Sequence, residues 1–145
     1  MVYKKFLNSI CAVALTFLLV AGFVGCSASY SASAIKEKLT SAGYTVEEVD
    51  IKFTDDTNPT ELKGLQKSFL VTKGSDENKE AAYILVFDSI SNADTGNLSD
   101  ARLDDLSELA KQKSGDSKKE NLIIGRFNNV VFAGAEAIKT AAGLG

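Results

Sequence analysis

A single long apolar segment, residues 6–24, divides this chain of 145 residues into two unequal parts. It follows the positive charges of Lys4 and Lys5 and is interrupted only by Asn8, Ser9, Thr16 and Gly22. A basic start, an apolar stretch and a small residue before a cleavage point are typical of a secretory signal peptide. An uncut transmembrane anchor is the alternative, because the segment's 19 residues approach the roughly 20 that span a bilayer. The small Gly25 and the cysteine after it, Cys26, favour the signal peptide.

The residues Val24-Gly25-Cys26 resemble the lipobox of bacterial lipoprotein precursors, although Phe23 stands where leucine is usual. The resemblance covers residues 1–26. It implies that signal peptidase II cuts between Gly25 and Cys26, and that the Cys26 thiol carries a diacylglycerol with fatty chains such as palmitate. Two such chains suffice for stable membrane attachment, since each buried methylene contributes about 0.8 kcal/mol. The resemblance places the protein on the extracytoplasmic face of a bacterial cell membrane.

Removal of residues 1–25 leaves 120 residues, which suits one domain. Cys11 leaves with the leader, so we expect no internal disulfide. Loss of Lys4 and Lys5 leaves 14 basic against 19 acidic side chains, a net charge of −5. Phosphate groups repel such a domain, and we therefore expect no nucleic-acid partner.

We divide the mature chain into a lipidated cysteine with a short tether, residues 26–34, and one domain, residues 35–145. Ile35, Leu39 and Ala42 share one helical face, which Ser33 caps at the start and Gly43 ends. In residues 48–53 apolar and charged side chains alternate, which predicts a strand with one buried face.

The sequence after residue 53 predicts four further strands and two helices. Residues 66–72, 81–88, 122–127 and 130–133 read as strands, and 81–88 is apolar on both faces as in a central strand. Asn128 and Asn129 predict a tight hairpin. A helix capped by Ser91 or Ser99 buries Leu103, Leu106, Leu109 and Ala110, and residues 135–142 form the last helix.

These elements predict an α+β fold in the order α-β-β-β-α-β-β-α. We expect a mostly antiparallel sheet of four to five strands, with the helices packed on one face. Residues 83–88 and 130–139 also resemble small uncharacterised lipoproteins of Gram-positive bacteria, a resemblance that implies no activity.

The chain contains no histidine, the commonest general base and metal ligand. Lipidation would also consume the thiol of Cys26. We therefore predict no catalytic residues, no metal and no cofactor other than the covalent diacylglycerol. Arg126 lies in an otherwise apolar strand, and a guanidinium there can grip a carboxylate or phosphate. Arg126 and Tyr44 are the predicted contact residues, although an arginine paired across the sheet or in water and a core tyrosine are the more ordinary interpretations.

The sequence thus predicts a membrane-anchored cell-envelope lipoprotein whose domain binds a ligand or an envelope protein and is not an enzyme. A hydrolase of wall polymers that uses two carboxylates is the first alternative. An accessory solute-binding component is the second alternative, although such receptors are generally much longer.

Overall fold

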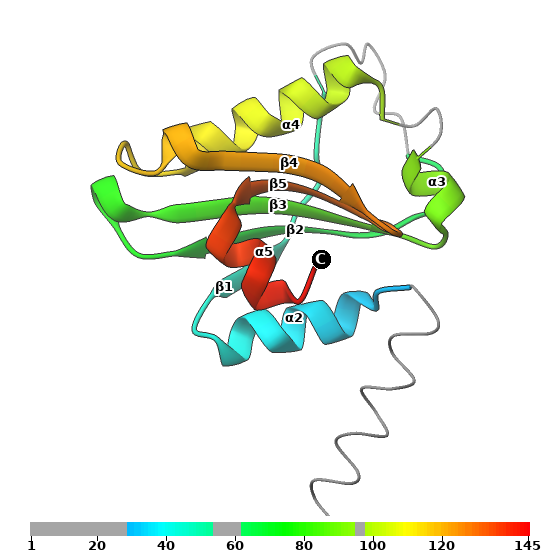
Figure 1. Ribbon diagram of the computed structural model, residues 1–145, viewed down its shortest axis with the longest axis horizontal. Coiled ribbons are helices and arrows are strands. Elements are labelled where there is room, and N and C mark those ends of the chain that lie inside the picture. The colour runs from blue at the N-terminus through cyan, green and yellow to red at the C-terminus, as the bar shows by residue number, and fades with distance from the viewer. Residues whose placement is uncertain (1–28, 54–61, 95–97) are drawn as a thin grey trace, which may run out of the picture.

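The computed structural model describes residues 29–53, 62–94 and 98–145 (Figure 1). The helices are α2 (Ala32–Ser41), α3 (Ile90–Asp94), α4 (Asp100–Lys113) and α5 (Glu136–Ala142), with short 3-10 turns at Asp76–Asn78 and Lys119–Asn121. The strands are β1 (Thr45–Glu48), β2 (Leu65–Lys73), β3 (Glu80–Phe87), β4 (Leu122–Phe127) and β5 (Val130–Ala135).

In the described part of the chain, all five strands form one antiparallel sheet in the order β1-β2-β3-β5-β4. β3 is the central strand, and its residues 81–87 are buried, as its apolar sequence predicted. β5 lies beside it and is buried along its whole length. The predicted α+β class and antiparallel sheet are therefore confirmed.

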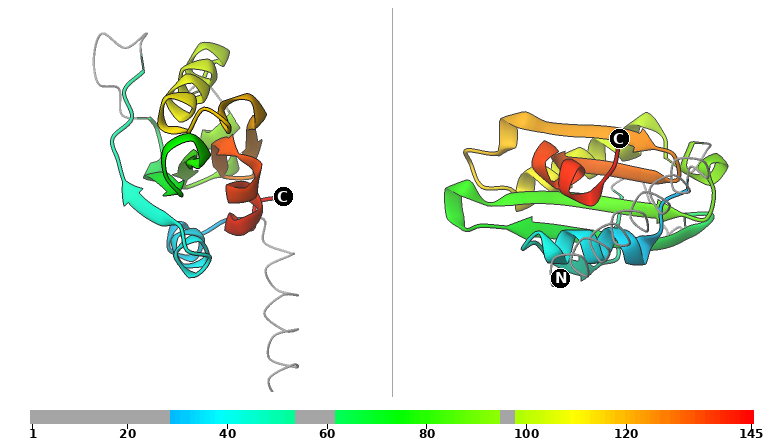
Figure 2. Two further views of the ribbon diagram at one scale, coloured as in Figure 1. Left: turned by 90° about the vertical axis from the view of Figure 1, so that its left-hand side faces the viewer. Right: turned by 60° about the horizontal axis from the view of Figure 1, so that its bottom comes forward.

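The helices cover both faces of the sheet and not one, which differs from the prediction (Figures 1 and 2). α2 and α5 pack on one face, against side chains such as Ile84 and Phe132. α4 packs on the other face, against Leu85 and Phe87. The reason lies in β3 and β5, because strands that are apolar on both faces need a cover on each side.

Local signals set the helix ends. Ser31 caps α2 by accepting a hydrogen bond from the Ala34 amide, so the cap lies two residues before the predicted cap Ser33. Residues 32–34, expected in the tether, are thus helical. Ser99 caps α4, as one of the two predicted alternatives, and Gly143 ends α5 in a left-handed conformation.

The strand expected at residues 48–53 lies earlier, at Thr45–Glu48. Val49, Ile51 and Phe53 still point into a core, as their alternation indicated, but it is the core under α4. Tyr44 and Val46 pack against the core of the opposite face. The chain therefore crosses the edge of the sheet between Val46 and Val49, and the observed alternation belongs to an extended crossing segment.

The charged segment after α4 packs against the β2–β3 turn. Its Gly115 amide donates to the carbonyl of Lys79 (2.8 Å), and the Ser117 amide donates to that of Glu77 (3.0 Å). A side chain at Gly115 would meet the backbone of Asp76 and Glu77, which explains a glycine at this point. One end of the domain is thus made of these two segments, and the β4–β5 turn lies at the other end (Figure 1).

Several predicted features fall outside the described residues: the apolar segment 6–24, Gly25 and Cys26. Within the described ranges, none of the helices has the length and apolar character needed to cross a membrane.

Candidate functional site

A polar groove lies where β1 separates from β2. β1 pairs with β2 only as far as Glu48, which is opposite Phe69, and the Val49 amide adds one bond to the Ser68 carbonyl (3.0 Å). Beyond that point the chain turns towards α4, so residues 65–67 of β2 have no partner in β1. The β2–β3 register also shifts between Leu65 and Lys67, which marks a bulge at Gln66.

The groove has a volume of about 370 Å³, within the range of small-molecule sites. The groove is open to solvent. Its lining combines charged, polar and apolar side chains: Glu48, Val49, Asp50, Leu65, Gln66, Lys67 and Ser68. The lining suits a small polar molecule or an extended peptide segment better than a purely apolar ligand.

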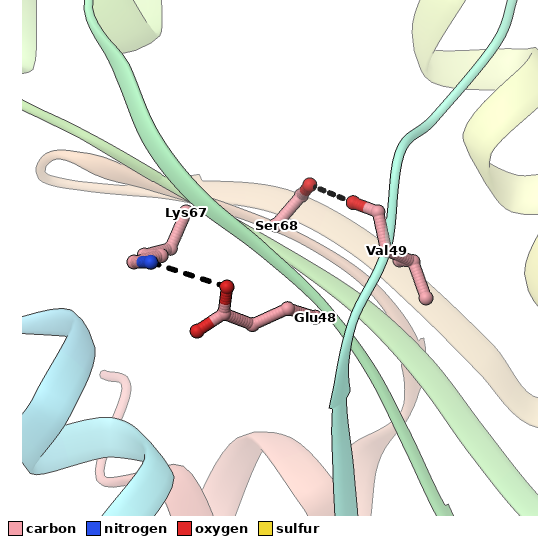
Figure 3. Close-up of polar contacts among 4 residues, drawn as sticks. All are labelled: Glu48, Val49, Lys67 and Ser68. Atoms are coloured by element: carbon pink, nitrogen blue, oxygen red, sulfur yellow. Dashed lines mark hydrogen bonds and ion pairs between the residues drawn. The ribbon is translucent and has the colours of Figure 1, made fainter.

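An exposed ion pair joins two of the residues that line the groove, Glu48 and Lys67 (Figure 3). Lys67 Nζ lies 3.1 Å from Glu48 Oε2, and the two side chains are 47% and 54% exposed. Such a pair contributes at most about 1 kcal/mol, so a ligand that offers either charge can replace one partner at little cost. Next to it, the Ser68 hydroxyl donates to the Val49 carbonyl and holds the crossing segment against β2.

A second hollow, of about 510 Å³, lies between α2 and α5. Glu37, Lys38 and Ser41 supply its polar atoms, beside two alanines. The groove at the β1–β2 edge brings a charge pair and a strand edge to one place, and it is therefore the stronger candidate.

Arg126 is engaged within the fold. Its Nε donates to the Ala93 carbonyl (3.1 Å) and its Nη2 to the Leu98 carbonyl (2.7 Å). The guanidinium therefore ties β4 to α3 and to Leu98, which precedes α4. This contact is neither of the alternatives that the sequence suggested, and a role of Arg126 in binding stays a prediction.

Tyr44, the other predicted contact residue, lies between α2 and β1. Its hydroxyl donates to Glu80 Oε2 (3.1 Å), and Lys73 Nζ lies 4.8 Å from the centre of its ring. Burial, and then the nearby Glu80 carboxylate, raise the pKa of Tyr44 above its ordinary value. Tyr44 lies at the β1 edge and Arg126 on β4 at the other, so the structure does not bring them into one site.

The groove residues were not predicted as a site. The sequence showed Glu48 and Asp50 only as the wet face of a strand, and Lys67 as a polar position in the next. Their meeting depends on β1 ending at Glu48 and on the bulge at Gln66, neither of which has a local sequence signal.

In residues 29–53, 62–94 and 98–145, no three or more histidine, cysteine, aspartate or glutamate residues are grouped so that they could hold a metal ion. Comparison of the chain with protein-family models, with curated proteins and with solved structures finds no match.

Proposed function

We propose that this chain is a lipid-anchored protein of the extracytoplasmic face of a bacterial cell membrane, and that its domain is a non-enzymatic interaction or ligand-binding module. The observation that carries the proposal is Cys26 directly after Val24-Gly25 at the end of the apolar segment 6–24. A diacylglycerol on this thiol would supply the two chains that stable attachment requires.

The position of the domain supports this reading. Its first helix, α2, is capped by Ser31, only five residues after Cys26. A domain with so short a connection would work at the membrane surface, on partners in that layer or on molecules that diffuse to it.

The anchoring is tested with the full chain in a bacterial host that matures lipoproteins. The wild type is expected in the membrane fraction as the shortened, lipid-modified form. Cys26→Ser removes the thiol that would be modified, so its product should remain unprocessed or leave the membranes after cleavage. Cys11→Ser is the matched control, because that thiol lies in the expected leader, and it should behave like the wild type. Normal processing and retention of Cys26→Ser would refute the proposal.

For binding, the groove around Lys67 and Glu48 is the proposed site. Melting temperatures are measured with a panel of polar sugars, amino acids and short peptides. A ligand of the groove should raise the melting temperature of the wild type and not that of the double variant Glu48→Gln/Lys67→Met.

A matched control exists on α4, where Lys111 and Glu108 form another exposed pair at 2.9 Å. The variant Glu108→Gln/Lys111→Met should keep the ligand-induced shift. A shift that persists in the groove variant, or the absence of any shift across the panel, argues against the groove.

The hydrolase alternative retains one specific observation, since Glu48 and Asp50 line the same groove. Two carboxylates on a glycan are the minimum set for glycoside hydrolysis. Release of soluble fragments from purified cell-wall polymer by the wild type, and not by Glu48→Gln, would favour this alternative over simple binding.

A further inference from the structure

The β4–β5 turn contains a buried polar side chain that binds the start of the domain. Asn129 is only 3% exposed. Its Oδ1 accepts from the Tyr30 amide (2.7 Å), and its Nδ2 donates to the carbonyls of Tyr30 (2.9 Å) and Phe87 (2.9 Å). A buried amide with its hydrogen bonds made in this way holds its partners in one arrangement.

Two further contacts fix the same point. The Phe87 amide donates to the Asn129 carbonyl (2.8 Å), so the turn is also bound to the end of β3 through its backbone. The Tyr30 hydroxyl lies 3.3 Å from both the amide and the carbonyl oxygen of Gly145. We call Tyr30, Phe87 and Asn129 the Tyr30 clamp.

The clamp lies at one end of the sheet. Phe87 is the last residue of β3, and Val130, the first residue of β5, directly follows Asn129. The β2–β3 turn, with Ser75, lies at the opposite end, beyond Lys73 and Glu80. β3 has eight residues, so the two ends are about 26 Å apart.

The chain between the proposed anchor and the clamp is short. Tyr30 is four residues after Cys26, and four residues reach at most about 14 Å when fully extended. If Cys26 is held in the bilayer, the clamp end must stay within that distance of it. The β2–β3 turn is farther from the clamp than the chain can reach.

We infer that the Tyr30 clamp sets the orientation of the domain, with the β4–β5 turn and the start of α2 facing the lipid headgroups and the β2–β3 turn pointing away. This inference rests on the proposed anchoring at Cys26. The membrane-facing residues next to the clamp, Ser31, Ser33 and Asn128, are uncharged and exposed, which suits a hydrated headgroup layer. Lys63 and Asp88 add one charge of each sign at this end.

The orientation also places the candidate groove. Leu65, which lines the groove, pairs with Phe87 of the clamp, so the groove opens near the membrane-facing end. A partner that occupies it therefore meets the domain close to the headgroups.

The inference is tested by thiol accessibility in the full, membrane-bound chain. Two matched exposed serines are replaced in turn: Ser33→Cys near the clamp and Ser75→Cys at the far end. A bulky, membrane-impermeant maleimide should label Ser33→Cys several-fold more slowly in membranes than in detergent. Ser75→Cys should react at the same rate in both.

Two controls test the cause of that protection. Insertion of a ten-residue Gly-Ser linker between Ser27 and Ala28 lengthens the chain without altering the clamp, and it should remove the protection of Ser33→Cys. Asn129→Ala in the Ser33→Cys background should reduce it, with near-ultraviolet circular dichroism showing that the domain is still folded.

The outcomes separate the orientation from the anchor. The wild type, whose Cys26 is expected to be modified, should not be labelled; labelling of Cys26 would contradict the anchor, and the orientation with it. An unlabelled wild type, together with equal protection of Ser33→Cys and Ser75→Cys or no protection of either, would overturn the orientation and leave the anchor standing.

Discussion

The two faces of the sheet are covered by different parts of the chain. α4, which covers one face, comes from the middle of the sequence and is a single helix of 14 residues. The other face is covered by α2 and α5, helices of 10 and 7 residues that flank the sheet in sequence and contact each other. Only the α2–α5 layer is therefore continuous with the segment that leads to the proposed anchor.

The same hairpin, β4–β5, fastens a remote segment at each face by a different kind of contact. The buried Asn129 holds the residue before α2, whereas Arg126, which is exposed, holds the connection before α4. Water can replace the hydrogen bonds of an exposed donor but not those of a buried amide. Removal of the Asn129 side chain should therefore lower the free energy of unfolding more than removal of the Arg126 side chain.

The largest expected effects are those of Phe132→Ala and Phe87→Ala, one in each core cluster. Both side chains are fully buried, and each substitution should lower the free energy of unfolding by about 3–5 kcal/mol. Because the two cores share one sheet, urea denaturation should remain a single transition. Two separate transitions in either variant would mean that the faces fold independently.

Asn129→Ala should lower the free energy of unfolding by about 1–3 kcal/mol, because it leaves the buried carbonyl of Phe87 without its side-chain donor. The control is Asn128→Gly in the same turn. Asn128 is exposed with φ 54°, a conformation glycine adopts freely, so that variant should be nearly neutral. Equal losses of unfolding free energy in the two variants would show that the stabilisation comes from the turn as a whole and not from the side-chain contacts of the clamp.

Arg126→Ala should lower the free energy of unfolding by about 1 kcal/mol or less. The Arg126 side chain is exposed, so water can replace its two hydrogen bonds to backbone carbonyls. Chemical denaturation measures this loss. Arg126→Lys retains the charge but not the planar pair of donors, and we expect it to resemble Arg126→Ala. If Arg126→Ala lowered the free energy of unfolding as much as Asn129→Ala does, the buried contacts of Asn129 would not be stronger than the exposed contacts of Arg126, contrary to our expectation.

The smallest expected effect is a fall in stability at alkaline pH that depends on two tyrosines. The raised pKa of Tyr44 and that of Tyr83, which burial raises, mean that the folded state holds these protons more tightly than the unfolded state. The stabilisation is complete below the ordinary tyrosine pKa of about 10 and is lost as pH rises through the folded-state values. Tyr44→Phe should weaken this decline in melting temperature above pH 10. If the melting temperature of Tyr44→Phe fell as steeply above pH 10 as that of the wild type, ionisation of Tyr44 would not contribute to the fall.

The positions of β2 to β5, the cap of α4 and the end of α5 were predictable, because their signals are local. The first strand was misplaced, since it lies at Thr45–Glu48 and not at residues 48–53. The apolar sequence of β3, the cap at Ser99 and the turn at Asn128 each depend on a few neighbouring residues. The placement of helices on both faces was missed, although the double-sided apolar pattern of residues 81–88 contained the signal.

The groove and the clamp could not be predicted, because each joins residues that are remote in sequence. Tyr30 and Asn129 are 99 positions apart, and Asn129 reads locally as a turn residue. Glu48 and Lys67 meet only because the chain crosses the sheet edge after β1. Arg126 was noticed as a charge in an apolar strand, but its carbonyl partners have no side-chain signature.

The most direct test of the anchored domain is the intact mass of the full chain expressed in a lipoprotein-maturing bacterium and extracted from its membranes. We expect the mass of residues 26–145 with a diacylglycerol on Cys26, with or without a further acyl chain on its amino group. The mass of the unmodified 145-residue chain, or of residues 26–145 without lipid, would contradict it.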